Sequence, residues 1–109
     1  MLLSNTETIP GFRTRRHIGL VQGNTIRAKN IGRDILAGLK NIIGGELTGY
    51  TELLTEARQE ATNRMIQQAQ SAGANAIVNI RFATSSITQG AAELFAYGTA
   101  VLVEQDTDE

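Results

Sequence analysis

Apolar and polar positions in the first half of the chain predict a strand followed by a short helix. Residues 18–26 are mostly β-branched or apolar and are interrupted by glycines, which predicts a strand that bends or bulges near Gly23. Asn30 is a good helix N-cap, and apolar residues recur with helical spacing over residues 31–43 before a Gly-Gly pair. We therefore expect a short helix that ends at this pair.

The longest helical pattern runs from about Thr51 to Ala72. Its apolar side is narrow and consists mostly of small residues, namely Leu54, Ala57, Ala61, Met65, Ala69 and Ala72. Polar residues occupy the opposite side, and Gly73 follows as the residue expected to end the helix. The small side chains predict that this helix lies close against a sheet, with Met65 in a packing role.

Two further strands are predicted over residues 76–83 and 93–104, joined in a hairpin by a Ser/Thr/Gly-rich turn over residues 85–90. The last strand is apolar on both faces, with Phe95, Tyr97, Thr99, Val101 and Val103 on one face and Leu94, Ala96, Gly98, Ala100 and Leu102 on the other. Such a strand is normally covered on both sides. The long helix can cover one side, and a neighbouring subunit is the simplest cover for the other. The short helix is the competing candidate.

Together these elements predict a single α+β domain over residues 1–109, with a mostly antiparallel sheet, one long helix and one short helix. Residues 1–12 and 104–109 are expected to be peripheral or frayed. The N-terminus has no basic, apolar leader, and about 18 consecutive apolar residues occur nowhere in the chain. We therefore expect a soluble, cytoplasmic protein without a membrane partner.

Composition adds an argument for self-association. Hydrophobic residues make up 41% of the 109 residues, and the chain contains no Trp, so the core is modest and mainly aliphatic. The net charge of −1 is unevenly divided: residues 1–55 hold seven basic and four acidic groups, and residues 56–109 hold three and seven. Halves of opposite sign could attract each other across a subunit boundary. A near-neutral total argues against nucleic acid as a partner.

Candidate metal ligands are few. The chain has no Cys, one His and two Met, which removes every thiolate site for a soft metal. A symmetric ring could gather His17 from each subunit around its axis, and this is the single route to a His-rich site. The alternative interpretation of His17 is an exposed residue at a strand end.

A candidate anion site lies at the start of the predicted short helix. Arg27, Lys29, Asn30 and Arg33 are close in sequence there, and free backbone N–H groups at a helix N-terminus favour a phosphate or carboxylate. The alternative is that Arg33 and its neighbour Asp34 form ion pairs between subunits.

Other chemistry is poorly supported. The hydroxyl residues have no general base close in sequence, and a Ser-His-acid triad would have to use His17, which no motif positions. Phe12 lies close to Arg13, Arg15 and Arg16, and an aromatic among arginines can stack on bases, but a solvated strand entry is the better explanation of this short segment. We therefore assign no catalytic residues and expect no nucleic-acid partner.

Several sequence blocks resemble the YbjQ-like family of small bacterial proteins. They are Gly-Asn-Thr-Ile-Arg-Ala-Lys-Asn-Ile-Gly-Arg-Asp from Gly23, Ala37-Gly38, Gly44-Gly45 with Tyr50 beyond, and Gly73-Ala74-Asn75-Ala76-Ile77-Val78 followed by Ile80. The resemblance covers residues 18–103 and rests on the order and spacing of these blocks. It implies a βαββ-type subunit with extra short strands, assembled as a homopentameric ring. The family is described as heavy-metal-binding without an established biochemical function, so a metal cofactor is implied by resemblance only.

Pattern and resemblance together predict a non-enzymatic, self-associating binding or assembly module. Its small ligand or metal ion would be held at subunit interfaces. The alternative is a small enzyme whose site is completed between subunits. An enzyme needs a group that transfers protons in a cleft, and the chain offers only His17 or a helix carboxylate for that role. An exposed His17 without a partner would weaken the enzyme and metal hypotheses together.

Overall fold

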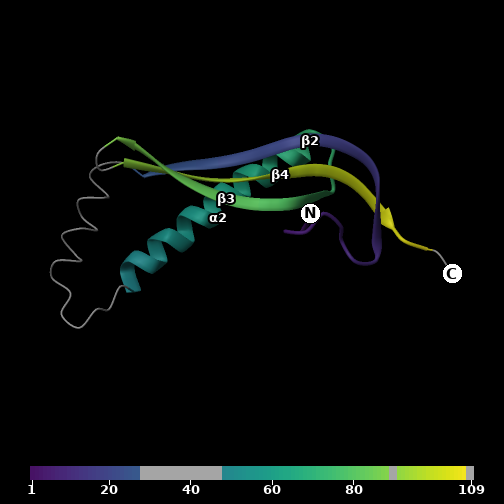
Figure 1. Ribbon diagram of the computed structural model, residues 1–109, viewed down its shortest axis with the longest axis horizontal. Helices are drawn as coiled ribbons and strands as arrows, with labels where there is room; N and C mark the ends of the chain where they lie inside the picture. Colours follow the sequence, from purple (N-terminus) through teal and green to yellow (C-terminus); the bar gives the residue numbers. More distant parts are fainter. Residues whose placement is uncertain (28–47, 89–90, 108–109) are drawn as a thin grey trace.

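The structure, a computed structural model, describes residues 1–27, 48–88 and 91–107. Its elements, in chain order, are β1 (Leu2–Leu3), β2 (Phe12–Arg27), α2 (Thr48–Ser71), β3 (Ala76–Thr88) and β4 (Ala91–Gln105). The strands form one sheet in the order β1-β3-β4-β2 (Figure 1). The predicted short helix over residues 31–43 lies outside the described residues.

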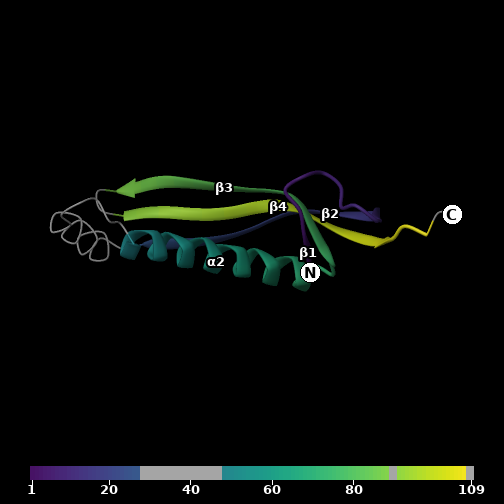
Figure 2. The same cartoon turned by 90° about the horizontal axis from the view of Figure 1, so that it is seen from below.

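The sheet is mixed. β4 pairs antiparallel with both β2 and β3, whereas β1 pairs parallel with β3 through Leu2 and Leu3. α2 lies along one face of the sheet, chiefly over β2 and β4 (Figure 2). This arrangement confirms an α+β domain whose sheet is mostly antiparallel.

β2 is longer than predicted, and its irregularities are not at Gly23. The register with β4 shifts between Thr14 and Arg16 and again between His17 and Gly19, while Gly23 pairs regularly with Ala96. Gly23 has a different role, because a Cβ atom there would overlap the carbonyl oxygen of Ala61 and the amide nitrogen of Met65. Glycine at this position therefore lets α2 approach β2 at backbone distance.

The long helix is confirmed, and so is the way it ends. Ala57, Ala61, Met65 and Ala69 are at most 2% exposed, so the middle of the predicted stripe faces the sheet. The two ends of the stripe do not, because Leu54 is 39% exposed and Ala72 is also exposed. Gly73 has a φ of 89°, its N–H donates to the carbonyl of Gln70, and the Ala74 N–H donates to the carbonyl of Ala69. These two bonds form a Schellman motif, which satisfies carbonyl groups that the last turn would otherwise leave without a partner.

The β3–β4 hairpin is confirmed, but its strands extend further than the sequence pattern indicated. Ser85 pairs with Glu93 and Thr88 with Ala91, so the predicted turn over residues 85–90 belongs mostly to the ladder. The serines and threonines of this segment favour a turn, but threonine in particular also fits a pleated strand when a partner strand lies beside it.

The two faces of the sheet are covered by different parts of the chain. On the helix side, Val21, Ala61, Met65, Ala69, Ile77, Ala96 and Ala100 form the first core cluster. On the opposite side, Ala76, Val78, Val101 and Val103 form a second, smaller cluster. Ile9 and Phe12 pack against the second cluster, so the N-terminal segment covers one end of this side. From the sequence, a neighbouring subunit or the short helix was the expected cover for this face, and the N-terminal segment was not expected there.

The molecule is long and thin. Its principal axes measure 60 × 27 × 16 Å, and its Cα radius of gyration is 17.6 Å. A compact domain of about 100 residues has a radius of gyration of about 13 Å. Among the described residues, α2 and a short N-terminal segment are the elements that pack over the two faces, and large apolar side chains such as Leu20, Ile26 and Phe82 stay exposed.

Replacing Gly23 by alanine tests the close approach of α2. We expect Gly23→Ala to lower the free energy of unfolding by about 1–3 kcal/mol, because the new methyl group meets helix backbone that cannot move aside independently. Arg16→Ala is the matched control on the same strand, since Arg16 is exposed and has no acidic partner among the described residues, and its loss should change the free energy by less than about 0.5 kcal/mol. Urea unfolding at one protein concentration measures both, and equal effects would contradict the assigned role of Gly23.

Candidate functional site

The predicted anion site lies almost entirely outside the part of the chain that the structure describes. Arg27 is the last residue of β2, while Lys29, Asn30 and Arg33 belong to the residues that are not described. The association of these four residues therefore stays a prediction from sequence.

His17 lies between the two register shifts of β2, where its backbone pairs with Val101 of β4. Its side chain is exposed, and it has no hydrogen-bond or ion-pair partner among the side chains that the structure describes. A general base needs a substrate proton or a nucleophile within hydrogen-bond reach. The position of His17 therefore weakens the enzyme hypothesis and the metal hypothesis together.

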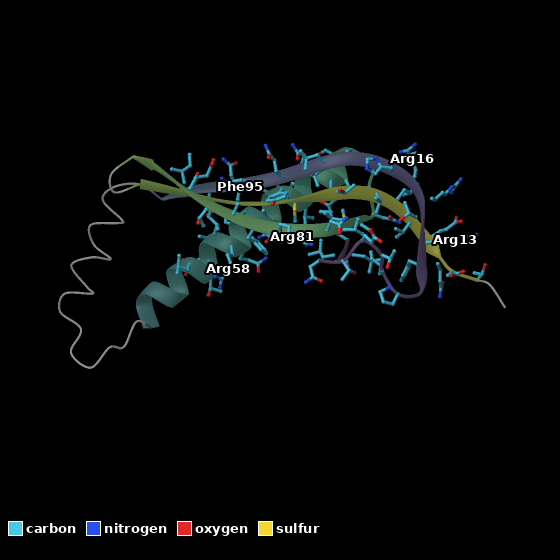
Figure 3. The ribbon with its side chains drawn as sticks, viewed as in Figure 1. Arg13, Arg16, Arg58, Arg81 and Phe95 are labelled. Carbon is cyan, nitrogen blue, oxygen red and sulfur yellow. The ribbon has the colours of Figure 1, made fainter. Side chains whose placement is uncertain are left out.

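The arginines beside His17 differ in their contacts. Arg13 Nε lies 2.8 Å from Glu104 Oε1 in an ion pair whose side chains are 52% and 41% exposed, so its contribution to stability is small. Arg15 and Arg16 are exposed and have no acidic partner within the described ranges. Arg13 and Arg16 both lie at the end of the sheet remote from the β3–β4 turn (Figure 3). Phe12 is partly buried against the second core cluster, which argues against a role in base stacking.

The donor set does not fit a soft metal ion within one subunit. Met65 lies on the side of α2 that faces the sheet and is 0% exposed, so its thioether serves packing. The chain has no cysteine and therefore no thiolate. Among the described residues, no three His, Asp or Glu side chains come together in a way that could hold a metal ion. A metal ion bound by His17 would need ligands from other subunits.

The sheet face opposite α2 is named here the open face, and beyond the N-terminal segment no described residue packs over it. Leu20 and Ile26 of β2 project from it and are 72% and 56% exposed. Phe95 and Tyr97 of β4 lie between β2 and β3 on this face, with ring centroids 5.7 Å apart. These side chains give the open face an aromatic and aliphatic surface in the middle of a polar one.

Polar groups surround the two rings. Asn24 pairs with Phe95 across the β2–β4 ladder, and its Nδ2 donates to Glu93 Oε2 at 2.9 Å. Arg81 pairs with Tyr97 from β3, and its Nη1 donates to the carbonyl oxygen of Asn5 at 2.7 Å (Figure 3). Arg81 thus fastens the N-terminal segment beside the aromatic pair. The alternation of residues 94–103 correctly placed Phe95 and Tyr97 on one face of the strand. The roles of Arg81 and Asn24 depend on strand register and were not predicted from the sequence.

Asn79 marks the place where the N-terminal segment joins β3. It has a φ of 55°, the single positive φ among the described non-glycine residues, and it coincides with a register shift between Val78 and Arg81. Its N–H donates to the carbonyl of Thr6 at 2.9 Å, and the Ile80 N–H donates to the carbonyl of Ser4 at 3.1 Å. This contorted backbone presents two successive N–H groups to the same segment.

The fold defines the class of this protein. It is a small α+β domain in which one long helix covers one face of a mixed four-stranded sheet. A structure from Pediococcus pentosaceus, described as a protein of unknown function in the DUF74 family, shares this fold with a TM-score of 0.62. The similarity covers 95% of this chain and 98% of that one at 13% identity, so it concerns the fold alone. None of the helices described is long and apolar enough to cross a membrane.

The chain belongs to the YbjQ_1 family, whose description reads "Putative heavy-metal-binding" and whose profile matches residues 1–104. A UPF0145 protein of Hahella chejuensis is 66% identical over 104 residues, which are 95% of this chain and all of that protein. A UPF0145 protein of Archaeoglobus fulgidus is 57% identical over 101 residues, or 93% and 94% of the two chains. The family resemblance inferred from sequence is thus confirmed, and the names of these relatives assign no reaction.

Removing the Arg81 side chain tests how the N-terminal segment is held. In Arg81→Ala the bond to the Asn5 carbonyl is lost, and we expect the amides of Asn79 and Ile80 to exchange about tenfold faster because their acceptors lie on the released segment. Arg58→Ala is the control, since Arg58 lies on α2 and donates to Thr55 of the same helix. Hydrogen exchange read by NMR compares the variants, and unchanged exchange in Arg81→Ala would remove the role assigned to Arg81.

Proposed function

We propose that this protein is a non-enzymatic binding or assembly module that works as a homo-oligomeric ring, with five subunits as its family resemblance implies. The observation that carries the proposal is the uncovered part of the open face. Leu20 and Ile26 expose most of their side chains there, beside the Phe95–Tyr97 pair. A neighbouring subunit would remove this surface from water, which favours association by roughly 25 cal/mol for each Å² of apolar surface buried.

The shape of the subunit supports the same proposal. A chain 16 Å thick and 60 Å long exposes more surface than a compact domain of its length, and association is a common way for small domains to gain a larger core. In a cyclic ring each subunit contributes two different surfaces to its two neighbours. The open face serves as one of them in this proposal.

The ligand of such a ring would lie where subunits meet. A small molecule beside the aromatic pair would find stacking surfaces together with the polar groups of Asn24 and Arg81. A metal ion is the less favoured ligand, because it would depend on His17 side chains gathered from several subunits. The anion site at Arg27, Lys29, Asn30 and Arg33 is the remaining proposal for a ligand.

Native mass spectrometry before and after addition of divalent cations tests the proposed function. We expect one oligomer of five subunits with an unchanged mass when Zn²⁺ or Ni²⁺ is added, because the described part of a single subunit has no suitable donor set. Stoichiometric metal uptake that His17→Ala abolishes would instead establish the metal-binding version of the ring. A stable monomer at micromolar concentration would overturn the assembly proposal.

A charge on the open face tests which surface the neighbour covers. Leu20→Lys should shift the protein toward smaller species by at least about tenfold in dissociation constant, because a buried, unpaired ammonium group is costly. Gln67→Lys adds the same charge to an exposed position on α2 and should leave the assembly unchanged. Sedimentation of both variants against the parent provides the comparison, and identical behaviour would exclude the open face from the interface.

A further inference from the structure

The sheet has two long edges, and α2 closes the middle of one of them. The Gln22 N–H of β2 donates to Gln68 Oε1 at 2.7 Å, and the Asn24 carbonyl accepts from Arg64 Nη1 at 2.6 Å. Both donor and acceptor point away from β4, since β2 is an outer strand of the sheet. Helix side chains therefore occupy backbone groups to which an added strand would bind.

The opposite edge is closed only at its beginning. The carbonyls of Asn75 and Ile77 in the β3 region accept from Leu2 and Ser4, at 3.1 and 2.9 Å, and the N–H groups of Asn79 and Ile80 donate to the N-terminal segment. Beyond Ile80 no further bond from that segment to the β3 backbone occurs within the described residues. β3 nevertheless continues to Thr88 in register with β4.

The direction of the backbone groups beyond Ile80 follows from the ladder. The Ile80 N–H points away from β4, and in an extended strand every second residue repeats that direction. Phe82 and Thr84 therefore direct both N–H and C=O outward, and neither has a hydrogen-bond partner on that side among the residues described. Each therefore offers a donor and an acceptor to which no described residue binds.

This edge lacks the devices that normally prevent strand addition. Residues 82–88 read Phe-Ala-Thr-Ser-Ser-Ile-Thr, without a charged residue or a proline, and are rich in residues that favour strands. The Phe82 side chain is 49% exposed on the face that carries α2, because α2 lies over β2 and β4 rather than over β3. An unpaired backbone edge thus adjoins an uncovered aromatic ring.

We infer that the free edge of β3 from Phe82 onward is an interface in which a second copy of this chain adds an extended strand. This inference rests on the proposed self-association and specifies where it takes place. The incoming strand pairs with the outward groups of Phe82 and Thr84, and its subunit covers the exposed part of the Phe82 ring. A second copy is the occupant favoured by the thin form of the molecule, because the described residues of the chain leave Phe82 49% exposed on the β3 side of the α2 face.

Thr84→Pro tests the edge directly. Proline removes the outward N–H of Thr84 and leaves the bonds of Ala83 and Ser85 to β4 in place, and a proline is tolerated at such an edge position. We expect the dissociation constant of the oligomer to rise about tenfold or more, measured by native mass spectrometry over a dilution series. Thr84→Val is the matched control, because it keeps the N–H and the β-branched shape, and it should assemble like the parent.

Hydrogen exchange in the parent protein gives a second test that does not depend on how the proline variant folds. In the oligomer the amides of Phe82 and Thr84 should exchange at least about a hundredfold more slowly than unprotected amides. Fast exchange of both amides in an intact oligomer, or a Thr84→Pro variant that is folded and fully assembled, would overturn the β3 interface while leaving the ring proposal standing. A monomeric parent would overturn both.

Discussion

The close contact between α2 and β2 is the constraint on which the rest of the structure depends. Gly23 brings the strand to the backbone of Ala61 and Met65, and the alanines of α2 remove the side chains that would hold the layers apart. Because the helix lies over β2 and β4, its side chains reach the outer edge of β2 and occupy backbone groups there. The same placement leaves β3 largely beyond the reach of α2. Among the described residues, the position of α2 therefore closes the β2 edge of the sheet and leaves the β3 edge beyond Ile80 free to pair with another strand.

The N-terminal segment complements this arrangement on the opposite face. Its first residues extend the sheet beside β3, and Ile9 and Phe12 cover the cluster around Val101 and Val103. The bent backbone at Asn79 and the bonds of Arg81 fix where this cover ends. Beyond that point the aromatic pair on β4 and the large aliphatic residues of β2 face outward. Burial of these exposed side chains is what the proposed association between copies would gain.

Membership of the YbjQ_1 family agrees with the fold, but the chemistry of the chain does not fit the family's metal-binding description within one subunit. Soft metals bind thiolates, thioethers and imidazoles, and here the internal thioether is sealed in the core while the lone imidazole is exposed beside arginines. An interface between copies could change this by bringing identical residues together. The metal-binding description therefore does not follow from the described residues of a single chain.

Periodicity alone determined the elements that depend on local pattern: the long helix, its glycine terminus, the hairpin and the two-sided apolar character of β4. These predictions succeeded because burial repeats with the period of the backbone and because Gly73 adopts a conformation that few other residues tolerate. Only the tertiary structure showed that Gly23 allows α2 to approach β2 and that residues 85–88 form strand. It also showed that residues 1–12 cover part of the sheet and where Arg81 and Asn24 lie. Each of these depends on which distant segment lies opposite, and a pairing between segments 40 or more residues apart, such as Arg64 with Asn24, leaves no local periodic signal.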